Sequence, residues 1–119
     1  MSVVQGLTII VAGSDPERFH SALSVAAANS ALGRRSRIFL QGESAALLAR
    51  AAGRESAREG VPSLSALIEE AMAVGVEIVA CQSGLALAGL SAEQLPEGVT
   101  TSGLIEILAS RGDDQLMMA

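Results

Sequence analysis

The chain of 119 residues contains no tryptophan, no tyrosine and no lysine, and it has only two phenylalanines. Its formal net charge is −5, so it lacks the basic surface that neutralises nucleic-acid phosphates. It also lacks the aromatic residues on which single-stranded bases stack. The sequence therefore predicts no nucleic-acid partner. Since no apolar run approaches the roughly 20 residues that a membrane helix needs, it predicts no membrane partner either.

Cysteine and histidine are equally scarce, with one residue of each. The single cysteine, Cys81, cannot form a disulfide within the chain, and the first residues lack the charged and apolar regions of a secretory signal. We therefore expect a cytoplasmic protein. One Cys and one His, His20, offer no metal-ligand spacing, and the loop after the first apolar run lacks both common nucleotide-binding glycine patterns. The sequence predicts no metal and no cofactor, and His20 is interpreted as an ordinary helix residue.

The residues that are abundant are small and apolar. Half of the chain is hydrophobic, with a mean hydropathy of +0.43, which predicts one folded domain over residues 1–119. Because this half consists mainly of Ala, Leu, Val and Ile, each side chain buries little area, and we expect burial between subunits to contribute. Two groups of arginines are interpreted as solvated surface, and three methionines as fillers of a core or an interface. These residues are Arg34, Arg35, Arg37, Arg50, Arg54, Arg58, Met72, Met117 and Met118.

Short apolar runs alternate along the chain with segments of helical spacing. This alternation is typical of an α/β protein, and it predicts a three-layer α/β/α arrangement with a mainly parallel sheet of about five strands. Residues 53–60 are predicted to form a surface loop. The predicted strands cover residues 7–12, 37–41, 76–80, 99–101 and 115–118. The predicted helices cover residues 16–32, 45–52, 63–74, 84–90 and 103–110.

Ligands of parallel sheets bind beyond the carboxyl ends of the strands, and small polar residues follow four of the predicted strands. Glycine and serine are also the ordinary residues of turns and helix caps, so this interpretation stays open beside the functional one. The candidate binding residues are Gly13, Ser14, Gln41, Gln82, Ser83, Gly84 and Ser102.

Cys81 is the most reactive group of this set. If a helix begins near Ser83, its free N–H groups and the positive end of its dipole favour the thiolate, which is a nucleophile. The alternative is an inert cysteine that packs as a small hydrophobic residue. The residues around Cys81 exclude some thiol enzymes: no second cysteine forms a redox pair, no arginine follows as in cysteine phosphatases, and Val76–Ala80 lacks the Pro and Thr of typical peroxiredoxins.

Several segments from Val76 onward resemble the DsrE/DsrF/TusD-like family. They are residues 76–81, 88–90, 98–104 and 112–118. The resemblance implies a small cytoplasmic α/β protein with five strands, commonly a trimer or hexamer. It also implies, for sulfur-relay members, a persulfide on the cysteine that matches Cys81, received from an upstream sulfurtransferase and passed to a partner. Residues 82–89 differ from relay members in having no cation, and the chain ends in Met118–Ala119 where relatives often have an aromatic residue.

These observations predict an intracellular sulfur carrier, or sulfurtransferase-like protein, in which Cys81 alone forms covalent bonds. Gly13, Ser14, Gln41 and Ser102 are expected to line its cavity, while N–H groups near Ser83 and Gly84 stabilise the anion. The expected partners are further copies of the chain, a sulfur donor and a sulfur acceptor. The alternative is a noncatalytic small-ligand-binding or assembly protein with an inert Cys81, and titration of the thiol separates the two.

Overall fold

The computed structural model describes residues 6–52 and 63–119, and within them five strands form one sheet. All neighbouring strands run parallel, in the order β4-β3-β2-β1-β5. This confirms the predicted α/β class and the five-stranded parallel sheet. The strands are β1 (Leu7–Val11), β2 (Ser36–Leu40), β3 (Glu77–Cys81), β4 (Thr100–Ser102) and β5 (Gln115–Met118).

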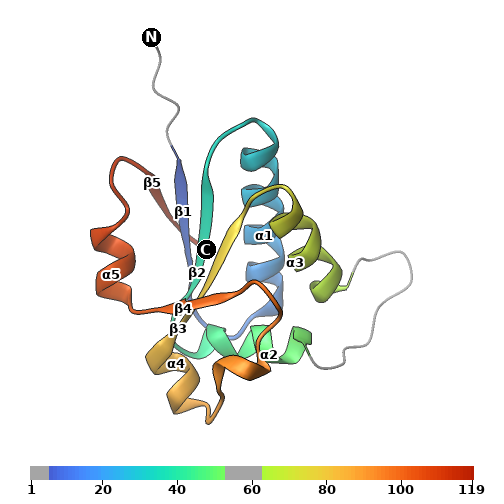
Figure 1. The fold of residues 1–119 in the computed structure, drawn as a ribbon, viewed down its shortest axis with the longest axis vertical. Helices are drawn as coiled ribbons and strands as arrows, with labels where there is room; N and C mark the ends of the chain where they lie inside the picture. Colours follow the sequence, from blue (N-terminus) through green and yellow to red (C-terminus); the bar gives the residue numbers. More distant parts are fainter. Residues whose placement is uncertain (1–5, 53–62) are drawn as a thin grey trace.

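Helices cover the sheet unequally. Figure 1 shows α1 and α3 side by side on one face of the sheet and α5 on the other, while α2 and α4 lie at the carboxyl ends of the strands. The arrangement is therefore three-layered, with one thin outer layer. The helices are α1 (Pro16–Ala31), α2 (Ala46–Ala52), α3 (Leu64–Ala73), α4 (Gln82–Leu87) and α5 (Leu104–Ala109), with two short 3₁₀ helices, η1 (Gly42–Ala45) and η2 (Ala92–Gln94). None of the described helices is long and apolar enough to cross a membrane.

Side-chain capping sets where the two longer helices begin. The carboxylate of Asp15 accepts the N–H of Glu17 at 2.9 Å, and Pro16 occupies the first turn of α1. The hydroxyl of Ser63 accepts the N–H of Ala66 at 3.1 Å at the start of α3. α1 thus begins at Pro16 as predicted, and α3 begins at Leu64, one residue after its predicted start, because Ser63 is the cap and satisfies a free N–H group of the first turn.

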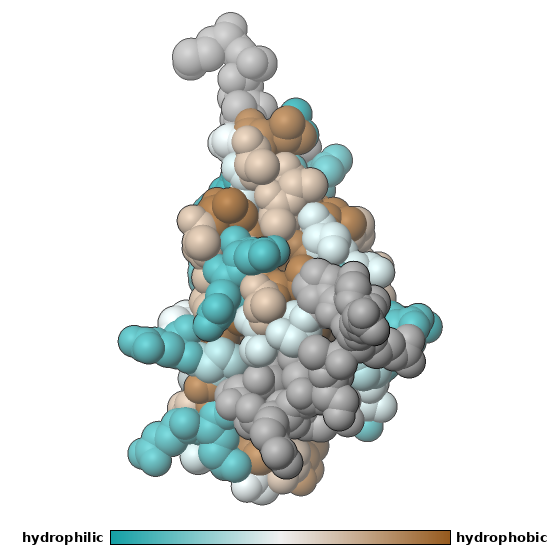
Figure 2. Space-filling model, turned by 90° about the vertical axis from the view of Figure 1, so that its right-hand side faces the viewer, coloured by the Kyte–Doolittle hydropathy of each residue, from teal (hydrophilic) through white to brown (hydrophobic). Residues whose placement is uncertain are grey.

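The alternation of side chains along the strands produces two hydrophobic clusters. The larger lies beneath α1 and α3 and contains Phe19, one of the two aromatic residues. The smaller lies on the face of α5 and contains the other, Phe39, together with Cys81. Figure 2 shows the outer surface on the α1 and α3 side, where apolar residues are scattered among polar ones. The core is thus thick on one face of the sheet and thin on the other.

Several predicted boundaries differ from the structure at the carboxyl edge of the sheet. β3 and β4 each end one residue later than predicted, so Cys81 and Ser102 are the last residues of their strands. α4 begins at Gln82, two residues earlier than predicted, because Cys81 itself caps the helix. Residues 42–45 form η1, which the pattern did not predict. The predicted loop at 53–60 lies outside the described residues.

One arginine departs from the predicted solvated surface. Arg37 occupies an inner strand, two residues before Phe39 and hence on the same face, so its side chain is half-buried and hydrogen-bonded. The prediction was wrong for Arg37 because charge clustering in sequence does not show on which face a strand places its side chains. Arg35 is exposed as predicted, although it also pairs with the buried carboxylate of Asp114 at 2.7 Å.

Candidate functional site around Cys81

Cys81 occupies the junction between β3 and α4. Its side chain is only 4% exposed, and its sulfur accepts the N–H of Gly84 at 3.4 Å. The hydroxyl of Ser83 lies 3.4 Å from the same sulfur and can donate to it. The thiol thus serves as the N-cap of α4, a position that Ser, Thr, Asp or Asn usually occupies.

A close approach of two glycines brings a third hydrogen-bond donor to this sulfur. A side chain on Gly84 would collide with the carbonyl oxygen of Gly42, and its Cβ would lie 2.8 Å from the carbonyl carbon of that residue. Gly42 itself has φ +60°, which favours glycine. Because Gly84 lacks a side chain, α4 and η1 meet backbone to backbone, and the N–H of Gly42 also bonds the Cys81 thiol.

These contacts determine the acidity of the thiol. Burial raises the pKa of Cys81, but hydrogen bonds from the Ser83 hydroxyl and from the backbone N–H groups of Gly42, Gly84 and Ser83 outweigh it. The net pKa lies below the ordinary value of a thiol. The thiolate is therefore stabilised by hydrogen bonds, and the site favours the nucleophilic form of cysteine.

The family model of the DsrE/DsrF-like proteins matches residues 5–115 of the chain, which includes the whole sheet up to the first residue of β5. The chain belongs to the DsrE/DsrF-like family. This confirms the resemblance found in the sequence, and it places Cys81 at the end of the third strand of a DsrE/DsrF-like fold.

Solved structures of similar fold extend over nearly the full chain of this DsrE/DsrF-like protein. The YchN protein from E. coli is 20% identical, covers 98% of this chain and 100% of its own, and superposes with a TM-score of 0.82. The protein of unknown function MTH1491 from Methanobacterium thermoautotrophicum is 18% identical, covers 97% and 99%, and gives a TM-score of 0.75. BT1422 from Bacteroides thetaiotaomicron, a conserved protein of unknown function, is 19% identical, covers 94% of each chain and gives 0.65. A search of curated proteins finds no match.

The structure brings some of the predicted site residues together. Ser83 and Gly84 contact the sulfur of Cys81. Ser102 is the register partner of Cys81 on β4, but its hydroxyl donates to the Glu106 carboxylate at 3.0 Å. Gln82 is exposed beside the cysteine at the start of α4. At the β3 and β4 ends, Ser83 and Gly84 therefore contact the thiol, while Gln82 and Ser102 lie beside Cys81, and their role in a site stays a prediction.

The other predicted residues lie at the same edge of the sheet but farther away. Gln41 is half-buried after β2, and its N–H donates to the carbonyl of Val11 at 2.9 Å. Gly13 and Ser14 follow β1, which lies two strands from β3, at a spacing of roughly 10 Å. The described hydrogen bonds do not join either residue to Cys81. If Gly13 and Ser14 belong to a site of this protein, they would therefore contact a bound molecule and not the thiol.

Sequence reasoning missed Gly42, which directly follows Gln41. The sequence shows only that a glycine follows each of two strands; the structure shows that these strands are adjacent and that a side chain on Gly84 would collide with Gly42. A pocket of about 680 Å³ lies elsewhere, between α3 and residues 93–97, and none of the predicted site residues lines it. Within residues 6–52 and 63–119, His, Cys, Asp and Glu form no group of three that could hold a metal ion.

Proposed function

We propose that the protein is an intracellular sulfur carrier that holds one sulfur atom as a persulfide on Cys81. The observation that carries this proposal is the set of hydrogen bonds on the Cys81 sulfur, which lowers the pKa of a thiol that is otherwise well buried. Membership of the DsrE/DsrF-like family supports it, because sulfur-relay proteins have this fold. The family match extends over residues 5–115 and would hold even if Cys81 were inert, so sulfur transfer by Cys81 needs a separate test.

The transfer requires only thiolate chemistry. The Cys81 thiolate attacks the outer sulfur of a donor persulfide, the donor's S–S bond breaks, and the donor leaves as a thiolate. The product is Cys81–S–SH. In the second step an acceptor thiolate attacks the outer sulfur of this persulfide, and Cys81 is released as the thiolate. Each step forms one S–S bond and breaks one, so neither an oxidant nor a reductant is consumed.

The same N–H groups stabilise sulfur anions in both states of this cycle. The N–H groups of Gly42 and Gly84 and the hydroxyl of Ser83 surround the thiolate before loading and after release. They favour the departing Cys81 anion in the second step, which makes it a better leaving group. Because the stabilisation comes from fixed backbone groups, it needs no cation near the cysteine, which is consistent with the absence of cations in residues 82–89.

A rival function has one observation in its favour. Cys81 is 4% exposed and packs against Ile10, Phe39, Val79 and Ile107, as an inert core cysteine would. On this basis the chain would be an assembly or small-ligand-binding protein whose cysteine takes no part in chemistry. The two functions make different predictions for the reactivity of the thiol.

The decisive experiment loads the purified protein with a low-molecular-weight persulfide and measures intact and peptide masses. We expect the added mass of one sulfur atom on the peptide that contains Cys81. The variant Cys81→Ser should take up no sulfur but should keep its far-UV spectrum and its melting temperature within a few degrees. The reason is that a serine hydroxyl can also accept the Gly84 N–H and cap α4.

The matched control is Ser83→Ala, which removes one donor to the sulfur and leaves the cysteine in place. We expect it to load more slowly at neutral pH, because the pKa of Cys81 rises when the hydroxyl is lost. A parent protein that takes up no sulfur, with an alkylation rate whose pH inflection equals that of a free thiol, contradicts the carrier function and leaves the assembly function.

The proposal includes further copies of the chain as partners. Five large apolar side chains on α5 and β5 are exposed, on the face of the sheet that is thinly covered. Burial of these residues between subunits would remove the largest exposed apolar area on that face from water. They are Leu104, Ile105, Leu108, Leu116 and Met118.

A further inference from the structure

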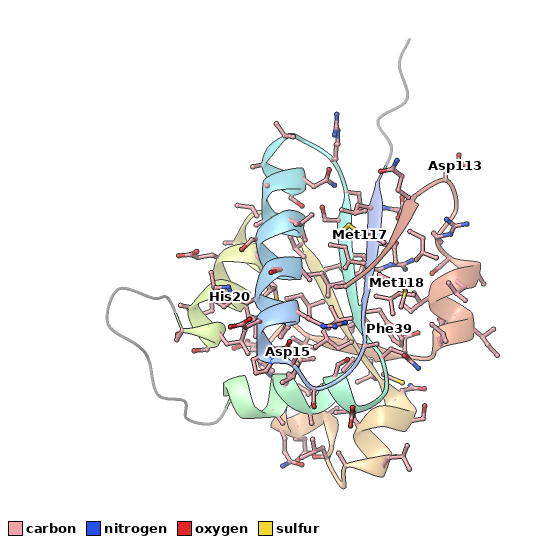
Figure 3. The ribbon with its side chains drawn as sticks, turned by 180° about the vertical axis from the view of Figure 1, so that it is seen from behind. Asp15, His20, Phe39, Asp113, Met117 and Met118 are labelled. Carbon is pink, nitrogen blue, oxygen red and sulfur yellow. The ribbon has the colours of Figure 1, made fainter. Side chains whose placement is uncertain are left out.

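α5 lies over the side of the sheet from which the Cys81 side chain projects. Ile107, which is 2% exposed, packs into the same cluster as Cys81, Phe39 and Val79. Figure 3, seen from behind, shows Phe39 and Met118 on the side of the sheet that faces α5. Displacement of this one helix would therefore open, from that side, the apolar cluster to which Cys81 belongs.

Hydrophobic burial alone holds α5 weakly. Of its six residues only Ile107 is buried, while Leu104, Ile105 and Leu108 are 37%, 86% and 44% exposed. A short element with a single buried side chain is among the parts of a fold that open most easily. Polar contacts at its two ends must therefore contribute to keeping it in place.

The contact at the C-terminal end comes from Arg37. One guanidinium nitrogen donates to the carbonyl of Ile107 at 3.1 Å, and the other donates to the hydroxyl of Ser110 at 2.9 Å. The Ser110 hydroxyl in turn donates to the carbonyl of Glu106 at 2.8 Å. A cation at the last carbonyls of a helix also matches the negative end of the helix dipole. At the other end of α5, Ser102 donates to Glu106.

Arg37 is itself fixed to the sheet. It belongs to β2, and the nitrogen that donates to Ile107, Nη2, also lies 3.4 Å from the hydroxyl of Thr8, which donates to the buried Asp114 at 3.2 Å. Its Nε is buried and has no hydrogen-bond partner in the described structure. A guanidinium with one unsatisfied buried donor costs stability, and its two shortest hydrogen bonds are those to α5 and Ser110.

We propose that Arg37 is a positioning residue that holds α5 over Cys81 and so sets how readily another molecule reaches the thiol. Access matters for sulfur transfer only if the proposed carrier function is right, but the attachment of α5 to the sheet rests on the contacts of Arg37, Ser110 and Ile107. This arrangement would slow the reaction of Cys81 with bulky molecules more than with small ones, whatever their charge.

The test measures alkylation of Cys81 by a small reagent, iodoacetamide, and by a bulky aryl maleimide, in the parent and in Arg37→Met. The methionine keeps much of the buried stem and removes the guanidinium. We expect the maleimide reaction to accelerate about tenfold, as the loss of a charge-assisted hydrogen bond suggests, and the iodoacetamide reaction much less. The control is Arg34→Met, which removes an exposed arginine from the turn before β2 and should change neither rate.

Two further readouts separate positioning from a general loss of stability. Local displacement of α5 exposes little surface, so the maleimide rate of Arg37→Met should hardly change with low concentrations of urea, whereas global unfolding would make it rise steeply. The pH inflection of the iodoacetamide rate should match the parent, because the donors to the sulfur are untouched. Arg37→Lys should give an intermediate maleimide rate, since one ammonium cannot reach both acceptors as the guanidinium does.

Ser110→Ala keeps the test decisive if Arg37→Met does not fold. This variant removes the hydrogen bond from Arg37 to Ser110 and should accelerate the maleimide reaction by a smaller factor than Arg37→Met does. Unchanged maleimide rates in the variants that fold, or an acceleration that follows the urea dependence of global unfolding, would overturn the proposal. Because alkylation involves no sulfur transfer, these outcomes are independent of whether the protein loads sulfur.

Discussion

The contact between Gly84 and Gly42 makes the site sensitive to a single methyl group. In Gly84→Ala the new Cβ would meet the carbonyl of Gly42, 2.8 Å from its carbon and 3.1 Å from its Cα. Both atoms belong to backbone, so neither can rotate away as a flexible side chain could. α4 and η1 must therefore separate, and the N–H groups of Gly42 and Gly84 must move away from the Cys81 sulfur.

The expected loss of stability is that of overpacking in a dense interior, about 1–3 kcal/mol. For a domain of this length, 1 kcal/mol corresponds to roughly 3–6 °C in melting temperature. We therefore expect the melting temperature of Gly84→Ala to fall by roughly 3–18 °C. The pKa of Cys81 should rise at the same time, because two of its hydrogen bonds are weakened.

Thermal unfolding followed by circular dichroism measures the first effect, and the pH dependence of iodoacetamide alkylation measures the second. Gly103→Ala is the matched control, since a Cβ at Gly103 meets no atom within 4 Å and its φ of −106° suits alanine. Because Gly103 is the N-cap of α5, where alanine is less favourable than glycine, the substitution should cost at most about 1 kcal/mol and leave the pKa of Cys81 as in the parent. A Gly84→Ala protein that melts and reacts like the parent would refute the assignment of this backbone contact to the support of the thiolate.

Two other predictions concern the thiolate and the thinly covered face. Because the folded-state pKa of Cys81 is lowered, its contribution to stability is fully present above the unfolded thiol value near 8.5 and is lost as pH falls through the folded pKa. Urea unfolding across this interval should show the parent gaining stability relative to Cys81→Ser as pH rises, and parallel pH profiles would contradict it. Met118→Glu, on the α5 face, should weaken self-association in light scattering, whereas Val25→Glu, on α1, should not; a parent that is monomeric at tens of micromolar would refute this expectation.

Much of the fold could be predicted from the sequence because its signals are local. A β-branched run such as Leu7–Val11 favours a buried strand whatever its neighbours are, and Asp15 and Ser63 cap helices through residues two or three positions away. The same holds for the order of strands and helices along the chain. Cys81 could be placed at a strand end because the apolar run that precedes it is short and continuous.

The remaining features depend on contacts between distant residues. Nothing near Gly42 in the sequence indicates that Gly84 will lie against it, and nothing near Arg37 indicates that Ile107 and Ser110 will be its acceptors. The strand order also could not be predicted from the sequence, because strand pairing depends on which faces and edges remain free after the helices pack. The start of α4 was misplaced because a cysteine is an uncommon N-cap.

The pairing of β1 with β5 has a consequence for the order in which the protein folds. β1 sits between β2 and β5, and its pairs with β5 join Leu7 to Gln115 and Ile10 to Met118, across nearly the whole sequence. The loop that such a pairing closes is the longest of any strand pair in the sheet, so its entropic cost is the highest. During synthesis β1 can pair with β2 early, but its other edge stays open until β5 has emerged. In that interval the edge of β1 is available to strands of other nascent chains, and the docking of β5 removes this route to aggregation.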